Sequence, residues 1–453
     1  MRKLFLLFFG VLSIILSAQD GSVDLNFNTG VGPNGYNIMA MGLQTDGKII
    51  VAGDFTSYDG VARKGIARLN SDGGIDQTFN PGSGIVGRIL NLIIQQDGKI
   101  IITGDFTQFN NIQKNYIARL NVDGTLDTSF NIAGSGPSNA VYSIAQQIDG
   151  RILIAGDFGS YNGISRGRVT RLNSDGTLDQ TFDSGIGSNN YLNSVVLQYD
   201  GKVLIGGYTS TYNNISRRTI ARLNSDGSLD TSFNPIGSGG NIPIYTMTVQ
   251  PDGKVIICGG FTSFNNVETG GIARLNTDGS LDTTFVKNNS ASANSAIVLP
   301  NGKILTNGNF YSTSKFHRLK ADGSIDKLFD TGGEVRRMIL QPDGKILVCG
   351  YFNSFNGISK KQIVRINGED LLSVSDIEKE NIQIYPNPVK DILNIKSDET
   401  ISDYEIYSLD GRKLTTGNKI NDSKIDVSHL TKGNYLLKVK TKEKEQTTKF
   451  IKE

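Results

Sequence analysis

Three aspartates at matching places along the sequence are its first candidates for chemistry. Asp54, Asp105 and Asp157 each follow a glycine that ends an apolar run. Carboxylates gathered at one mouth of a channel can bind a cation or the hydroxyl groups of a sugar. Solvated acids at strand ends are the more ordinary explanation, because clustered acids mark a site in only some proteins. The three aspartates belong to successive units of a repeat that is described below. The later units of this repeat have Gly207, Gly260, Asn309 and Tyr351 at the same place.

A second candidate set is a series of aromatic residues, each followed by Asn or Asp, in the loops after these glycines. Aromatic rings on one loop-bearing face can stack on sugars. Alternatively, each ring pins its own loop, while the Asn or Asp makes the turn. The residues are Tyr58, Phe109, Tyr161, Tyr212, Phe264 and Phe355.

An arginine and an aspartate recur in every unit. Because a reaction needs one site and a scaffold needs many, this repetition predicts a structural Arg–Asp ion pair in each unit. If it is buried, loss of one partner costs about 3–5 kcal/mol. The arginines are Arg68, Arg119, Arg171, Arg222, Arg274, Arg318 and Arg365. The aspartates are Asp24, Asp76, Asp127, Asp179, Asp230, Asp282 and Asp326.

The segment from Asn70 to Asp76 is also similar to an oxygen-rich calcium loop, with Asp72 between them. It lacks the closing Glu of such loops, and an Asp-Gly hairpin turn explains the same residues. Calcium therefore stays an alternative, and the sequence indicates no other cofactor.

The sequence lacks the residue patterns of most catalytic sites. The two histidines, His317 and His429, lie far apart in the sequence, and there is no zinc spacing, nucleophile elbow or phosphate-binding loop. A net charge of +2 argues against nucleic-acid binding. Cys258 and Cys349 occupy the same place in two separate units, which predicts two buried thiols rather than a disulfide.

The elements that position these residues come from a repeat. Seven units of about fifty residues each carry two Asp-Gly-type turns, a period typical of a four-stranded propeller blade. In the first unit we expect strands over 37–44, 49–52, 65–70 and 75–80, with a loop over 56–64. The last unit lacks a fourth strand, and residues 22–28 supply one without a unit. Pairing them would close a ring and remove an exposed sheet edge.

These residues resemble a known family. The segment from Ile66 to Asn80, together with Asp46 to Ile49, is similar to the delta-60 repeat family, and the similarity recurs seven times over residues 20–367. The resemblance implies an all-β chain with a seven-bladed β-propeller over 19–368, and a secreted location. It implies no agreed activity.

The two ends of the chain predict its destination. Residues 1–18 have the basic start, apolar core and small-residue exit of a signal peptide, and no other stretch would span a membrane in the mature chain. After a linker over 369–380, residues 381–453 alternate as in a small β-sandwich. This module resembles the type A sorting domain of the type IX secretion system, which implies export from a Bacteroidota-type bacterium, with release or surface attachment. The matching residues are Tyr385, Pro386, Asn387, Pro388, Gly433, Tyr435 and Lys449.

The sequence therefore favours a secreted or cell-surface binding module, with the secretion machinery and an extracellular glycan or protein as partners. A carbohydrate-active lyase or hydrolase working from the propeller mouth is the first alternative. A purely architectural surface protein is the second.

Overall fold

The computed structural model describes the chain in a series of ranges, all of which consist of strands and turns. They are residues 20–132, 134–235, 237–286, 290–310, 313–368, 382–397, 400–408, 413–418, 424–431, 433–441 and 445–453. The expected signal peptide and linker lie outside these residues. Within them, no helix is long and apolar enough to cross a membrane. The chain divides into two compact units, one formed by the repeat region and one by the C-terminal region, and each is described by itself.

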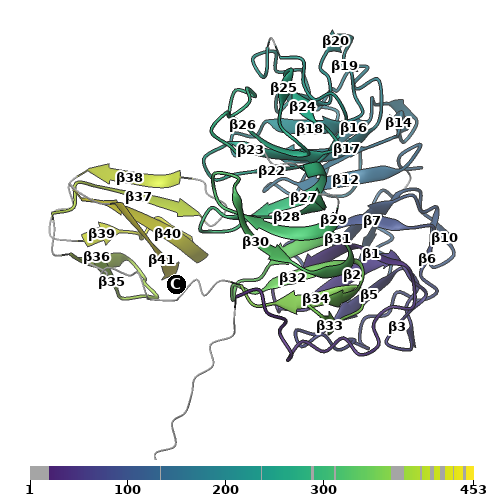
Figure 1. The fold of residues 1–453 in the computed structure, drawn as a ribbon, viewed down its shortest axis with the longest axis horizontal. Coiled ribbons are helices and arrows are strands. Elements are labelled where there is room, and N and C mark those ends of the chain that lie inside the picture. Colours follow the sequence, from purple (N-terminus) through teal and green to yellow (C-terminus); the bar gives the residue numbers. More distant parts are fainter. Residues whose placement is uncertain are drawn as a thin grey trace, which may run out of the picture. The chain divides into compact units, whose positions relative to one another are not determined.

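The first unit is a propeller of seven blades, each with an antiparallel sheet of inner, middle and third strand (Figure 1). The inner strands are β1 (Asn37–Leu43), β7 (Ile89–Ile94), β12 (Val141–Gln146), β17 (Leu192–Leu197), β22 (Ile244–Val249), β27 (Ser290–Val298) and β31 (Thr331–Leu340). The middle strands are β2 (Ile49–Asp54), β8 (Ile100–Gly104), β13 (Ile152–Gly156), β18 (Val203–Gly207), β23 (Val255–Gly259), β28 (Ile304–Phe310) and β32 (Ile346–Phe355). The third strands are β5 (Ile66–Leu69), β11 (Ile117–Leu120), β16 (Val169–Leu172), β21 (Ile220–Leu223), β26 (Ile272–Leu275), β29 (Thr313–Leu319) and β34 (Ile363–Ile366).

Short strands occupy the segments where a plain loop was expected. In five blades they form small hairpins, one of which β6 joins as a third strand, and in the last blade β33 pairs with the end of β32. They are β3 (Ser57–Tyr58), β4 (Val61–Ala62), β6 (Ile85–Val86), β9 (Gln108–Phe109), β10 (Ile112–Gln113), β14 (Ser160–Tyr161), β15 (Ile164–Ser165), β19 (Thr211–Tyr212), β20 (Ile215–Ser216), β24 (Ser263–Phe264), β25 (Val267–Glu268) and β33 (Ile358–Ser359).

The fourth strand is shorter than expected. In the first blade it is a single bridge between Leu69 and Ile75. The chain then turns, because Asp76 Oδ1 accepts hydrogen bonds from Thr78 N and Thr78 Oγ1 at 2.9 and 2.6 Å. In the sixth blade Leu328 stands where the first has Thr78 and offers no hydroxyl. There the chain stays extended as β30 (Ile325–Phe329).

The N-terminal segment closes the ring, as expected. Val23 bridges Ile366, and Asp24 N donates to Arg365 O at 2.8 Å. Like the fourth position of most blades, this segment pairs through one bridge rather than a full strand. Figure 1 shows the purple N-terminal segment beside the green strands of the last blade. The ring therefore has no open edge at its seam.

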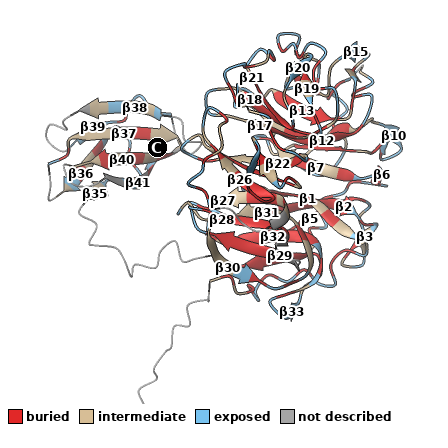
Figure 2. Ribbon diagram, turned by 45° about the horizontal axis from the view of Figure 1, so that its top comes forward, coloured by how far each residue is buried: buried red, intermediate tan, exposed pale blue. Residues whose placement is uncertain are grey.

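The core lies between blades. The middle strands β8 and β13 are buried at every residue, because both of their faces are covered. Figure 2 shows buried residues of the propeller strands in red. One apolar cluster, for example, joins Ala52 of β2 to Ile102 of β8 in the next blade. Cys258 and Cys349 are free and buried, which confirms that they form no disulfide.

The expected Arg–Asp pair is present in all seven blades, with the Arg Nε and Asp Oδ2 atoms 2.5–2.7 Å apart. It also ties neighbouring blades together. Arg171 Nη1 donates to Ser225 O in the following blade at 2.7 Å, and the Arg171 guanidinium lies 5.1 Å from the centre of the Phe182 ring. Arg365 makes the same bond across the seam, to Ser71 O at 2.6 Å. The repeated ion pair is therefore part of a continuous ring of blade-to-blade contacts.

The second unit consists of two antiparallel sheets with strand orders β35-β36-β39 and β38-β37-β40-β41. Side chains of both sheets, among them Leu393, Ile406 and Phe450, make one apolar core. The strands are β35 (Ile382–Tyr385), β36 (Ile392–Ser397), β37 (Asp403–Ser408), β38 (Lys413–Asn418), β39 (Lys424–Asp426), β40 (Gly433–Lys440) and β41 (Glu445–Lys452).

Candidate functional site

A bulge in every inner strand places one residue of each blade beside the central channel. The pairing of each inner strand with its middle strand skips one residue at this bulge, and the pairings of β27 and β31 contain a second shift nearer the start of the strand. Opposite the bulge every middle strand has a glycine; at Gly104, a Cβ would come within 2.0 Å of Arg88 O. Only glycine permits this close approach. The seven bulge residues are Met39, Leu90, Tyr142, Asn193, Tyr245, Asn294 and Arg336.

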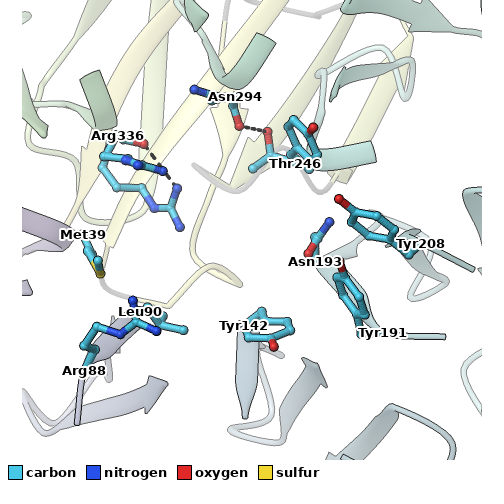
Figure 3. Close-up of a pocket in the computed structure, with 12 residues that line it drawn as sticks. Met39, Arg88, Leu90, Tyr142, Tyr191, Asn193, Tyr208, Thr246, Asn294 and Arg336 are labelled. Carbon is cyan, nitrogen blue, oxygen red and sulfur yellow. Dashed lines mark hydrogen bonds between the residues drawn. The ribbon is translucent and has the colours of Figure 1, made fainter. Parts of the chain in front are cut away.

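All seven bulge residues line one cavity of about 590 Å³, a size typical of small-molecule sites. Five further residues complete its wall: Arg88, Tyr191, Tyr208, Thr246 and Arg337. Figure 3 shows that the wall is divided by chemistry. Arg88 and Arg336 lie on one side, and Tyr142, Tyr191 and Tyr208 lie on the other.

The tyrosines form a packed cluster. The rings of Tyr191 and Tyr208 are tilted against each other with centroids 4.3 Å apart, and Tyr142 meets Tyr191 edge-on at 6.0 Å. Burial, and next the hydrogen bond with Tyr208, raise the pKa of Tyr191 well above its usual value. Burial also raises the pKa of Tyr142 and of Tyr245. At neutral pH these phenols are therefore protonated, and they can donate hydrogen bonds.

The arginines differ in their partners. Arg88 Nε donates to Asp105 Oδ2 at 2.8 Å, and Arg336 Nη2 lies 2.9 Å from Glu334 Oε2. Arg337 forms no ion pair with a carboxylate among the described residues; its Nη1 donates to Arg336 O at 3.2 Å. Burial lowers the pKa of Arg337, but a guanidinium stays charged at neutral pH.

The three sequence-predicted aspartates lie at the ends of middle strands and not in the cavity wall. Asp105 pairs with Arg88, and Asp157 Oδ1 lies 3.2 Å from Arg168 Nη1. Asp54 is exposed. In the fourth blade the pairing places Gly207 opposite Leu192, so Tyr208, and not Gly207, stands at the position of the acids. The Gly206-Gly207 doublet hid this one-residue shift from sequence reasoning, and with it a wall residue.

The six predicted aromatic rings are fully buried, so in this structure they have no face to offer a sugar. Tyr161 OH donates to Gly176 O at 2.6 Å, and Tyr212 OH donates to Gly227 O at 3.1 Å, each within its own blade. The residue after each ring has a positive φ, for example 49° at Asn162. Burial thus favours the alternative, in which the ring pins its loop and Asn or Asp makes the turn. The set comprises Tyr58, Phe109, Tyr161, Tyr212, Phe264 and Phe355.

The segment compared with a calcium loop has its last carboxylate, Asp76, occupied by protein donors. Asp76 Oδ2 accepts from Arg68 Nε at 2.7 Å and Lys48 Nζ at 2.8 Å. Across the ranges that the structure covers, no group of three or more His, Cys, Asp or Glu side chains is placed to hold a metal ion.

In the second unit Asn387, Gly433 and Tyr435 contact the C-terminal strand β41, and Lys449 lies within it. Asn387 Oδ1 accepts a hydrogen bond from Ile451 N at 2.8 Å, and Tyr435 stacks on Phe450 with ring centroids 5.5 Å apart. Gly433 is the first residue of β40, and Lys449 of β41 pairs with Leu436 of β40. The stretch Tyr385, Pro386, Asn387 and Pro388 is exposed. It is therefore accessible to a partner.

Family models match both units. The model described as "Domain of unknown function (DUF5122) beta-propeller" matches seven times, and the model described as "Secretion system C-terminal sorting domain" matches residues 383–453. The seven matches cover residues 44–79, 95–130, 147–182, 198–233, 250–285, 299–329 and 341–370.

Several solved structures are similar to this chain at low identity. The extracellular domain of the putative hybrid two component system BT4673 from B. thetaiotaomicron has 14% identity and a TM-score of 0.48; the alignment covers 95% of this chain and 58% of that one. The WD40 beta propeller domain of Doa1 has 14% identity and a TM-score of 0.49, covering 75% of this chain and 95% of that one. Streptogramin B lyase has 18% identity and a TM-score of 0.44, with coverages of 75% and 96%. No curated protein matches the chain.

Proposed function

This chain belongs to the DUF5122 beta-propeller family, and we propose that it is an extracellular binding module whose ligand, a saccharide, enters the central cavity. Its C-terminal sorting domain indicates secretion or attachment to the outer-membrane surface in Bacteroidota. The finer assignment, to binding at the cavity, is the part proposed here.

One observation carries the proposal. Scaffold positions keep one residue type around the ring, as the Arg–Asp pair does in all seven blades. The bulge position, in contrast, has Met, Leu, Tyr, Asn, Tyr, Asn and Arg, all facing one cavity. Because the seven blades have the same backbone there, packing does not dictate these differences. Binding of a single asymmetric ligand would explain why the seven side chains differ.

The wall supports binding better than catalysis. Among the described residues that line it there is no carboxylate, histidine or cysteine, so this lining lacks the paired acid and base of a hydrolase. A lyase that used a tyrosine as its base would need a lowered phenol pKa, whereas the pKa values of Tyr142, Tyr191 and Tyr245 are raised. The enzyme alternative would therefore require catalysis in a cavity whose side chains are poorly suited to act as acid or base.

A glycan array tests the proposal with the chain from Gln19 to Glu453 and two matched variants. Leu90→Trp fills part of the cavity, while Ile148→Trp places the same side chain on an exposed turn at the far end of β12. We expect saccharide signals that Leu90→Trp abolishes and Ile148→Trp keeps. A blank array, or signals that survive Leu90→Trp, would overturn the proposal in favour of protein partners or an architectural role. Cleaved glycans would favour the enzyme.

A further inference from the structure

We propose that the saccharide carries carboxylates, as a chain of uronic acids does, with Arg336 and Arg337 binding a carboxylate and the Tyr191–Tyr208 pair contacting the sugar faces. This inference rests on the proposed function and names the ligand class of the same cavity.

The charges of the wall select an anion. Every charged side chain that lines the cavity is an arginine. Two of the three are balanced at the rim: Arg88 by Asp105, and Arg336 by Glu334. Such half-exposed pairs contribute little to stability. Arg337 adds a positive charge that pairs with no carboxylate among the described residues, so its guanidinium is the group that an anionic ligand would neutralise.

Packing does not explain Arg337. It directly follows the bulge residue Arg336 on β31, and at the same place the other six blades have small or uncharged residues. They are Ala40, Asn91, Ser143, Ser194, Thr246 and Ser295. Several of these make blade-to-blade bonds, such as Thr246 Oγ1 to Asn294 O at 3.0 Å. A half-buried cation without an acid destabilises a fold, and its presence at this place favours a ligand that compensates it. A planar guanidinium can bind a carboxylate through two parallel hydrogen bonds.

The opposite wall suits a sugar ring. Tyr208 is 41% exposed and packs against Tyr191, so this pair presents both aromatic surface and hydroxyl groups to the cavity. A pyranose offers a C–H face for the ring and hydroxyls for the phenols. The amides of Asn193 and Asn294 are already engaged, by Ile244 O and Glu334 Oε1. The tyrosines therefore form a wall on which a sugar ring can stack, and the arginines on the opposite side form a wall that can bind an anion. An acidic peptide could bind the arginine wall, but it has no sugar ring to stack on the tyrosine wall.

Calorimetric titration tests the inference with a pair of ligands that differ in one group: an oligogalacturonate and the same oligosaccharide after its carboxylates are reduced to alcohols. The key variant is Arg337→Ser, which installs the residue that three sister blades have at this place. Arg218→Ser removes the same charge from an exposed loop outside the cavity and is the control.

We expect the oligogalacturonate to bind and the reduced form to bind about ten- to a hundredfold more weakly, as for loss of a charged hydrogen bond. Arg337→Ser should weaken oligogalacturonate binding by a similar factor without lowering the melting temperature, and Arg218→Ser should leave binding unchanged. Equal binding of both oligosaccharides that Leu90→Trp abolishes would overturn the carboxylate inference and leave the proposed function standing. No binding of either, together with other saccharide signals on the glycan array, would overturn the carboxylate inference alone; no binding of either together with a blank array would overturn both. Competition by an oligoglutamate peptide as strong as that by oligogalacturonate would overturn the saccharide assignment, as would an unchanged affinity in Arg337→Ser.

Discussion

Replacing Asp179 by Asn should destabilise the propeller strongly, because it removes one charge from its most buried ion pair. The side chains of Arg171 and Asp179 are each only 5% exposed, and their Nε and Oδ2 atoms are 2.6 Å apart. Asparagine has nearly the same size, and its oxygen can still accept the bonds from Thr181 N and Oγ1. The variant therefore leaves the packing in place and the Arg171 guanidinium without its counter-ion.

The magnitude follows from the cost of an uncompensated buried charge, about 3–5 kcal/mol. For a unit of about 350 residues, an unfolding entropy of ~2.1 cal/mol/K per residue is ~0.7 kcal/mol per kelvin. We therefore expect the melting temperature to fall by about 4–7 °C. Differential scanning calorimetry of the parent chain and the variant measures this shift directly.

The control for this experiment is Asp105→Asn, which breaks an Arg–Asp pair of the same kind at the half-exposed rim. Exposed pairs contribute about 0–1 kcal/mol, so its melting temperature should change by roughly 1 °C or less. If Asp179→Asn melted like Asp105→Asn, the buried pair would contribute no more than a surface pair. The view that these pairs hold neighbouring blades together would then be wrong.

Two further predictions concern pH and thiols. Burial alone would raise the pKa of Asp230, but hydrogen bonds from Lys202, Ser232 and Arg222 outweigh it and hold the pKa well below the usual value. A carboxyl with a depressed pKa adds stability that is present above the unfolded pKa of about 3.9 and is lost as the pH falls toward the folded value. The melting temperature should therefore be nearly constant from neutral pH to about pH 5 and fall steeply below about pH 4; a fall beginning near pH 6 would implicate other groups. Burial raises the pKa of both Cys258 and Cys349 to about 12, so a thiol reagent at neutral pH should modify neither in the folded chain and both in denaturant. Rapid modification of the folded chain would show that these strands open.

The scaffold was predictable because its chemistry repeats. Asp24 and Arg365 stand at the two ends of the repeat region, and the repeat alone indicated that they complete one blade. Their Nε–Oδ2 distance of 2.7 Å equals that of Arg68 and Asp76 in an uninterrupted blade. The fourth strand was overpredicted, since an alternating pattern does not show that Asp76 captures Thr78 and ends the pairing.

The cavity wall escaped prediction because it depends on a bulge. A bulge shifts the register by one residue, so an inner-strand residue such as Tyr142 reaches the channel although simple alternation gives no reason to single it out. One signal was present in the sequence: each middle strand has a glycine opposite the bulge, as at Gly156, where a Cβ would meet Ala140 O at 2.1 Å. A glycine repeated at a strand end marks a close backbone approach. Burial of the loop aromatics, such as Tyr161, depends on packing between elements and was equally out of reach.

The two kinds of position explain how one repeat can both fold and discriminate. The stabilising contacts, such as Arg171 with Asp179 and Ser225 O, lie on the third strand and the outer turns, away from the channel. The bulge residues follow a glycine-dependent backbone shift that is the same in every blade, so their side chains can vary without loss of the ring. Stability therefore constrains the outer part of each blade, and ligand chemistry is free to differ at the inner strand. At Arg337 the two requirements conflict. Its unpaired positive charge lowers the stability of the fold, and under our proposal the same charge binds the carboxylate of an acidic sugar.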